Sequence, residues 1–250
     1  DSQEEIILWF EHDLFDQTIL WYLLYRLQQL NVSDHQIYLL SIGAYPGIEP
    51  FLGMGQLNLE QLQTIAGTWK PITKQQLELG KIAWQAYTSP SPTALEQLLN
   101  QDTSALPYLH QAVHMHLNRF PSVNNGLNVV EQMTLEKLMA AAAKPLDLFR
   151  QVNRKLADFG MGDLQFWSAL EAMMAAPSPL ISLQPDDPRT NALLELPKFN
   201  HTDPAFLDAN IMITESGKEV CQGAEDWLKK CQFDRWLGGV HLHGSKKIWR

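Results

Sequence analysis

Residues 6–42 combine two apolar runs with one apolar helical pattern, and this combination constrains the fold more than any other part of the chain. Ile6–Phe10 and Ile37–Ile42 are apolar runs, which is typical of strands buried on both faces. Between them, Asp13–Leu30 has a helical pattern that is apolar almost all round, so we expect a buried helix. Strand, helix and strand within about 40 residues predict a βαβ unit with two parallel strands.

Two parallel strands are too few for a stable sheet, so the βαβ unit should be incomplete by itself. The sequence shows no further strand before residue 120. We expect either a protein partner or an N-terminal segment upstream of Asp1 to complete the sheet. The second is favoured because the first strand begins almost at Asp1.

Residues 58–122 form a predicted helical segment with clear helix-start signals. Capping-box spacing begins at Asn58, Thr73 and Thr93, and prolines separate the helical patterns. The stretch at 121–126 has the composition of a turn. It therefore predicts a domain boundary.

Three more helical patterns follow this boundary, at 128–142, 145–156 and 163–176. Asn128 starts the first of them with another capping-box spacing. Leu180–Leu183 and Ile211–Thr214 can pair as strands around a proline-rich loop. Three helices followed by two paired strands is the element order of a winged helix.

The predicted fold class is therefore α/β plus mostly α: a partial βαβ unit, a helical segment, and a winged-helix domain with a C-terminal strand. The corresponding domains are 1–57, 58–122, 123–223 and 224–250, the last being a helix and strand that dock on the body.

Composition narrows the class of protein. Hydrophobic residues make up 45% and charged residues 19%, which is typical of a globular chain. No apolar run approaches the roughly 20 residues that span a bilayer, so no membrane association is expected. The net charge of −9 disfavours a nucleic-acid partner. Two cysteines, Cys221 and Cys231, suit the reducing cytosol, and a cytoplasmic location is expected.

Four titratable residues, Glu11, His12, Asp13 and Asp16, lie where the first strand ends and the helix begins. Open α/β sheets bind ligands at the carboxyl ends of their strands. Glu11 and Asp13 could hold Mg²⁺ or Mn²⁺ through carboxylate oxygens, with His12 as a ligand or general base. Alternatively, Asp13 caps the helix and Asp16 complements its dipole. Capping leaves Glu11 and His12 unexplained. Gly53-Met54-Gly55 is expected to be a turn near this cluster.

A second candidate lies near the C-terminus, where Arg235, His241 and His243 could form an anion-binding corner. His241 and His243 alternate by two, so on a strand they share a face. The alternative is a C-terminal strand that docks through Trp236, Val240 and Trp249.

Two further patterns bear on function. His110 and His114 have the spacing that places two imidazoles on one helix face. Gln111 stands where a zinc protease has its glutamate base, so protease activity is not expected. The predicted helix at 163–176 has two acidic and no basic residues, which favours a protein contact over DNA readout.

Several segments of the chain are distinctive when taken together: Trp9–Gln17, Gly53–Leu57, Phe120–Ser122, Asn125–Leu127, Gly162–Asp163, Phe166–Trp167 and Arg235–Leu242. They resemble a bacterial family of unknown function, the eighteen-thirty-five family. The resemblance covers nearly the whole chain and implies that relatives carry a further N-terminal segment with a Gly-Asp motif, which this sequence lacks. It implies no established activity.

Three functions remain open from the sequence. The first is a cytosolic regulatory or interaction protein whose acidic α/β end binds a divalent metal or a metal–nucleotide. The second is a winged-helix transcription regulator that binds DNA. The third is a metal-dependent hydrolase or phosphotransferase, which needs the carboxylates of Glu11 and Asp13 to converge on one cation.

Overall fold

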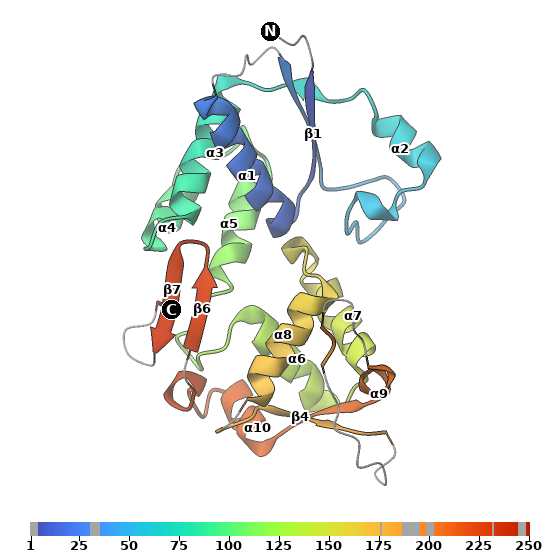
Figure 1. Cartoon of the computed structure of the whole chain (residues 1–250), viewed down its shortest axis with the longest axis vertical. Helices are drawn as coiled ribbons and strands as arrows, with labels where there is room; N and C mark the ends of the chain where they lie inside the picture. Colours follow the sequence, from blue (N-terminus) through green and yellow to red (C-terminus); the bar gives the residue numbers. More distant parts are fainter. Residues whose placement is uncertain are drawn as a thin grey trace. The chain divides into compact units, whose positions relative to one another are not determined.

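A computed structural model describes residues 5–30, 36–175, 177–186, 196–198, 203–231, 233–244 and 249–250. The chain is mixed α/β with small sheets (Figure 1) and divides into two compact units. The first unit comprises Asp1–Leu117, Ala157–Gly160 and Trp236–Val240, and the second comprises the rest. This division does not test the finer four-part division, which stays a prediction.

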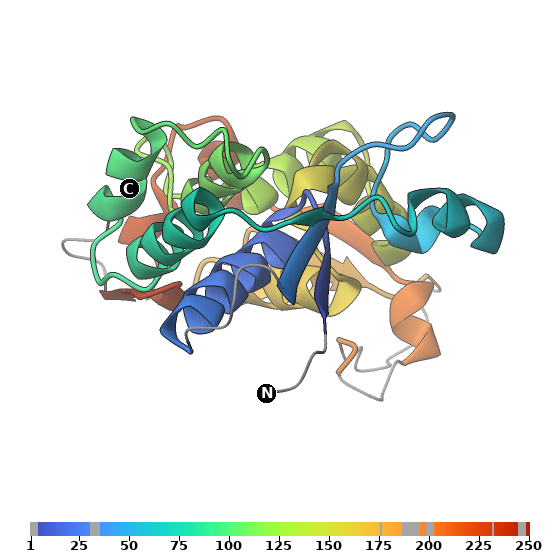
Figure 2. The same ribbon diagram turned by 90° about the horizontal axis from the view of Figure 1, so that it is seen from above.

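The first unit contains the predicted βαβ arrangement. Strand β1 (Ile6–Glu11) pairs in parallel with β2 (Ile37–Ile42), from Ile6 opposite Ile37 to Glu11 opposite Ile42. Helix α1 (Leu14–Gln29) lies between them in the sequence and buries Leu20, Trp21 and Leu24. It packs mainly against α3 (Lys74–Tyr87), and both helices lie on the same side of the strand pair (Figures 1 and 2).

The expectation of no further strand before residue 120 is wrong. Strand β3 (Lys70–Pro71) pairs antiparallel with β2, so the sheet order is β1-β2-β3. It was missed because it is two residues long, exposed, and contains a proline, which is tolerated only at a sheet edge. Within the described part of the chain, β1 is the opposite edge of this sheet.

Local capping signals set most helix starts of the first unit. Asn58 and Thr73 form the predicted capping boxes of α2 (Leu59–Ile65) and α3. The third prediction is wrong, because α4 (Thr93–Leu99) has Pro92 as its N-cap and Thr93 inside its first turn. The hydroxyl of Thr93 instead forms a hydrogen bond with the hydroxyl of Ser91. The unit also contains the 3₁₀ turns η2 (Met54–Gln56) and η3 (Ala157–Phe159) and helix α5 (Leu109–Leu117).

The second unit has three helices followed by two paired strands, as predicted. The helices are α6 (Val129–Ala140), α7 (Pro145–Lys155) and α8 (Asp163–Met174). Asn128 forms the predicted capping box of α6. Strands β4 (Ile181–Gln184) and β5 (Asn210–Ile213) pair antiparallel. The buried rings of Phe166 and Phe206 both pack against Trp167.

The remaining elements follow β4. The predicted proline-rich loop lies partly outside the described residues, and its end forms α9 (Pro204–Leu207). Helix α10 (Glu215–Cys221) and the 3₁₀ turn η4 (Trp227–Lys229) come next. The prediction of a single C-terminal strand is wrong, because β6 (Phe233–Leu237) and β7 (Val240–Gly244) form a two-stranded sheet. No helix in the described residues is both long and apolar enough to cross a bilayer.

Candidate functional site

The candidate site lies at the carboxyl end of β1, where the chain turns into α1. Glu11 is the last residue of the strand and Leu14 is the first of the helix. Because β1 and β2 are parallel, their carboxyl ends meet at one edge of the sheet, the usual ligand-binding edge of this fold class.

Asp13 and Asp16 bind the backbone. Asp13 is the N-cap of α1, and its Oδ1 accepts a hydrogen bond from the backbone N–H of Asp16 at 2.8 Å. The carboxylate of Asp16 in turn accepts from the N–H of Glu11 at 2.7 Å. The Gln17 side chain donates to the carbonyl of Glu11 at 2.6 Å. The predicted capping role of Asp13 is therefore confirmed, and the first turn of α1 is fastened to the end of β1.

The carboxylate of Glu11 binds the backbone of a loop that is distant in the sequence. Its Oε1 accepts a hydrogen bond from the backbone N–H of Met54 at 2.6 Å. Gly53 approaches so closely that a Cβ there would lie 2.0 Å from Oε2 of Glu11. The prediction that Gly53-Met54-Gly55 turns near the acidic cluster is confirmed, and the carboxylate has a structural role that sequence reasoning did not find.

His12 is the least satisfied member of the cluster. It is 9% exposed, and its Nε2 lies 3.4 Å from Oδ1 of Asp158 in η3. Nδ1 is buried without a hydrogen-bond partner among the described residues. The rings of Phe51 and Tyr108 lie about 6 Å from the imidazole, at 6.1 and 6.0 Å between centroids. No sequence signal connects these residues to His12, because they come from distant segments.

Burial and mutual repulsion disfavour charge on two of the carboxyl groups. The pKa of Glu11 is raised from its usual value, mainly by burial, with repulsion from Asp16 and Asp13 adding to it. The pKa of Asp13 is raised mainly by burial, and repulsion from Asp16 again contributes. Among the charged groups that shift either pKa, only His12 favours the ionised form. The site is thus an acidic cluster with little compensating positive charge.

The four junction residues do not make a compact ligand set. Among the described residues, the only group of three or more acidic, histidine or cysteine side chains with ligand atoms within 4.8 Å of one another is Asp234, His241 and His243. A metal held by Glu11 and Asp13 together stays a prediction. It would need these two side chains to turn from their present backbone partners.

The predicted C-terminal anion corner stays a prediction, and its Arg235 has an anionic partner. Its guanidinium donates to Oε1 of Glu131 at 2.6 Å, and Glu131 is fully buried. His241 and His243 do share a face, as predicted, with 5.4 Å between ring centroids. They lie against Asp234, an anion, on the opposite side of the strand from Arg235.

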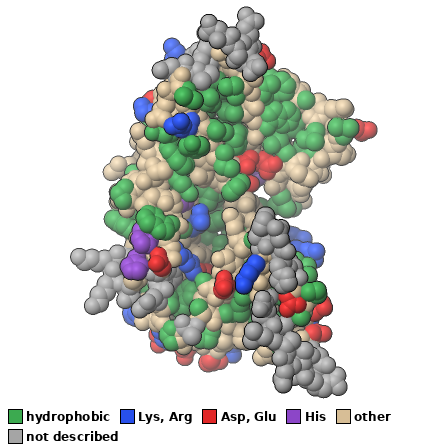
Figure 3. All heavy atoms as spheres, viewed as in Figure 1, with side chains coloured by type: hydrophobic (Ala, Val, Ile, Leu, Met, Phe, Trp, Pro, Cys, Tyr) green, Lys and Arg blue, Asp and Glu red, His purple; other side chains and the backbone are tan. Residues whose placement is uncertain are grey.

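Histidine side chains gather beside an acidic one on the surface over β6 and β7 (Figure 3). Sequence reasoning missed Asp234. Gly238-Gly239 between two short runs is a hairpin signal, and it would have placed Asp234 on the strand opposite His241 and His243. The other predicted pair, His110 and His114, also shares a face, with 4.8 Å between ring centroids.

Comparison of the chain with protein-family models, curated proteins and solved structures found no match. The geometry of the two clusters is therefore the basis for assigning function.

Proposed function

We propose that the chain is a regulatory or interaction protein whose β1–α1 junction binds a divalent cation of the Mg²⁺ or Mn²⁺ class, alone or with a nucleotide. The observation that carries the proposal is that the carboxylates of Glu11, Asp13 and Asp16 gather at the carboxyl end of β1. Burial, with repulsion between these groups, raises the pKa of Glu11 and of Asp13. Ionisation of these groups is therefore less favourable in the folded chain than in water. A bound cation would offset that cost.

The ligand chemistry supports a hard cation. Carboxylate oxygens are the donors that Mg²⁺ and Mn²⁺ prefer, so the support comes from Glu11 and Asp13 rather than from the imidazole of His12. A nucleotide would need the cation as a bridge, since the start of α1 is already occupied by the carboxylates of Asp13 and Asp16. These groups would repel a bare phosphate.

The second unit supports an interaction role. Its three helices and paired strands follow the order of a winged helix, and Ala143, between α6 and α7, bridges to Ile211 of β5. A winged helix uses its third helix for recognition. The exposed positions of that helix, α8, carry two acidic, one apolar and two neutral polar side chains and no basic one: Asp163, Leu164, Gln165, Ser168 and Glu171. This surface favours a protein partner over DNA.

Direct contact with DNA is the second candidate, because α7 exposes Arg150, Arg154 and Lys155. We expect no measurable binding to mixed-sequence duplex DNA at low salt, measured by fluorescence anisotropy. Three basic side chains are few beside the acidic face of α8. Tight binding that falls steeply with added salt, and that Arg150→Ala with Arg154→Ala weakens, would establish the transcription-regulator reading instead.

Glu11→Gln is expected to stabilise the protein at neutral pH in the absence of metal. The pKa of Glu11 is higher in the folded chain than its unfolded value, near 4.5. Such a carboxyl group stabilises the fold at pH values below the unfolded pKa. This stabilisation is lost as the pH rises through the folded pKa. Glutamine keeps an oxygen for the N–H of Met54 but carries no charge. The gain in melting temperature should therefore shrink toward zero in acid, as measured by thermal unfolding between pH 3 and 8.

Glu11→Gln also tests whether the β1–α1 junction binds a divalent cation. We expect Mg²⁺ or Mn²⁺ to raise the melting temperature of the natural protein and to bind Glu11→Gln at least about tenfold more weakly, because a metal-site group is lost. Glu60→Gln, on the exposed surface of α2, is the matched control and should behave like the natural protein. A flat calorimetric titration of the natural protein with both ions would remove the cation from the proposal.

A further inference from the structure

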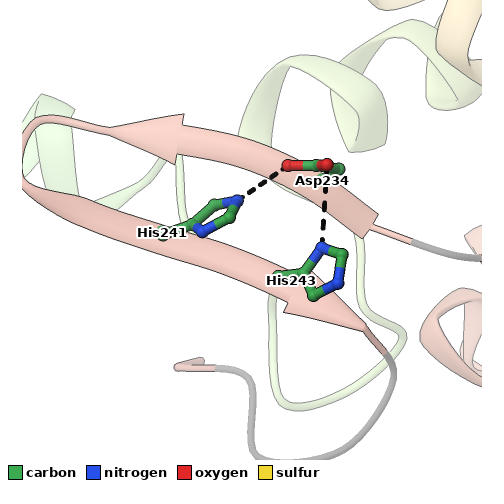
Figure 4. Close-up of side chains that lie close together, drawn as sticks. All are labelled: Asp234, His241 and His243. Atoms are coloured by element: carbon green, nitrogen blue, oxygen red, sulfur yellow. Dashed lines mark hydrogen bonds and ion pairs between the residues drawn. The ribbon is translucent and has the colours of Figure 1, made fainter.

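Three side chains converge on one face of the β6–β7 hairpin. Asp234 comes from β6, and His241 and His243 come from β7 (Figure 4). Nε2 of His241 lies 2.7 Å from Oδ1 of Asp234, and Nδ1 of His243 lies 3.7 Å from Oδ2. One ligand atom from each residue lies within 4.8 Å of the other two. The three donors are therefore near enough to one another to be drawn onto a single ion.

The geometry of strand β7 places the two histidine side chains on the same face. Alternate residues of a strand point to the same face, so His241 and His243 project together while Val240 and Leu242 project to the other face. Val240 and Leu242 are each 2% exposed. The ligand face is thus open to solvent, while the opposite face is anchored by buried side chains.

The donor distances lie near those of a tetrahedral site. With metal–ligand bonds of about 2.1 Å, two donors of a tetrahedral site lie about 3.4 Å apart. The two contacts of Asp234, at 2.7 and 3.7 Å, fall on either side of that value. Changes in side-chain torsion of all three exposed residues can therefore bring their donors onto one ion without moving the strands.

We propose that Asp234, His241 and His243 bind one zinc-class transition-metal ion on the open face of the β6–β7 hairpin. Two imidazole nitrogens and one carboxylate oxygen suit Zn²⁺ and its neighbours rather than Mg²⁺ or Ca²⁺, which prefer all-oxygen sites. Three protein ligands leave the fourth position open to water or to a donor from a partner. The site differs in ligands and in metal class from the one proposed at the β1–α1 junction.

Other zinc donors in the chain need controls. His110 and His114 form an exposed pair on α5, which could bind Zn²⁺ through two ligands. The thiols are weaker competitors. Burial, with repulsion from Glu131, raises the pKa of Cys231 to about 12, and burial also raises that of Cys221. The thiolate forms that bind zinc are therefore disfavoured.

The test is a titration of the metal-stripped full chain with Zn²⁺, in competition with a chromophoric chelator. We expect one equivalent to bind the natural protein and the His114→Ala control with the same affinity. Asp234→Ala, His241→Ala and His243→Ala should each weaken binding at least about tenfold, since even outer-shell losses cost 10- to 100-fold. Co²⁺ in place of Zn²⁺ should give visible absorption bands that the three variants lose.

Any other outcome of this titration contradicts the proposed metal site. If the natural protein binds no Zn²⁺, or if all three variants bind it unchanged, the hairpin is not a metal site. If only the histidine variants weaken binding, Asp234 is not a ligand and the three-ligand site is wrong. All three residues are exposed, so circular dichroism and melting temperature should be unchanged in the variants. Glu11→Gln should leave Zn²⁺ binding intact, which separates this site from the proposed Mg²⁺ site.

Discussion

Arg235→Met is expected to lower the free energy of unfolding of the second unit by about 3 kcal/mol, the low end of the range for breaking a buried ion pair. Glu131 is fully buried. One of its oxygens accepts from the N–H of Asn128 in the capping box of α6, and the other accepts from Arg235 at 2.6 Å. Methionine retains the apolar stem of arginine and removes the guanidinium, with its charge and its hydrogen bond to Glu131. The carboxylate of Glu131 is then left buried and uncompensated.

Urea unfolding followed by circular dichroism measures the loss, and a second substitution identifies its cause. Glu131→Gln removes the uncompensated charge but keeps an oxygen for the capping bond, so the double variant should regain at least half of the lost stability. Lys218→Met is the matched control, because its ion pair with Glu215 is largely exposed and should contribute under about 0.5 kcal/mol. A cost below 1 kcal/mol for Arg235→Met, or no recovery in the double variant, contradicts the assigned role of the pair.

Elements that depend on local chemistry were predictable from the sequence. The strands β1 and β2 are recognisable as apolar runs, and Asp13 caps α1 through a bond to a residue three positions ahead. The capping boxes at Asn58 and Asn128 have the same local origin. Such signals need no knowledge of what packs nearby. They therefore predicted β1, α1 and β2 in the first unit and the order of α6, α7, α8, β4 and β5 in the second.

Features that depend on distant segments were not predictable in the same way. The carboxylate of Glu11 binds a loop more than forty residues away, at Met54, and no spacing rule connects the two. His12 meets Asp158 from a much later segment. Strand β3 is set by its partner β2 rather than by its own exposed residues. The acidic cluster could thus be located from the sequence, but the backbone partners of its carboxylates could not.

The loop at Gly53 offers the sharpest test of that long-range contact. Gly53→Ala is expected to cost about 3 kcal/mol of stability, for two reasons. The residue has φ of +142°, a region that side-chain-bearing residues adopt only at a cost of about 1–3 kcal/mol. In addition, its Cβ would lie 2.0 Å from Oε2 of Glu11. The carboxylate would have to move and give up the N–H of Met54, a charged hydrogen bond that contributes about 1.5–3 kcal/mol.

Gly55→Ala is the matched control, because a Cβ at Gly55 meets nothing within 4 Å and its φ is not positive. Thermal and urea unfolding should show a large loss for Gly53→Ala and little change for Gly55→Ala. In a Glu11→Ala background the steric part of the cost disappears and only the backbone strain remains, so the penalty at Gly53 should fall by about half. Equal penalties in the two backgrounds would mean that Glu11 does not hold the loop. A reduced penalty would show that the end of β1 and the turn at Gly53 are energetically coupled, so that any ligand of Glu11 also acts on that turn.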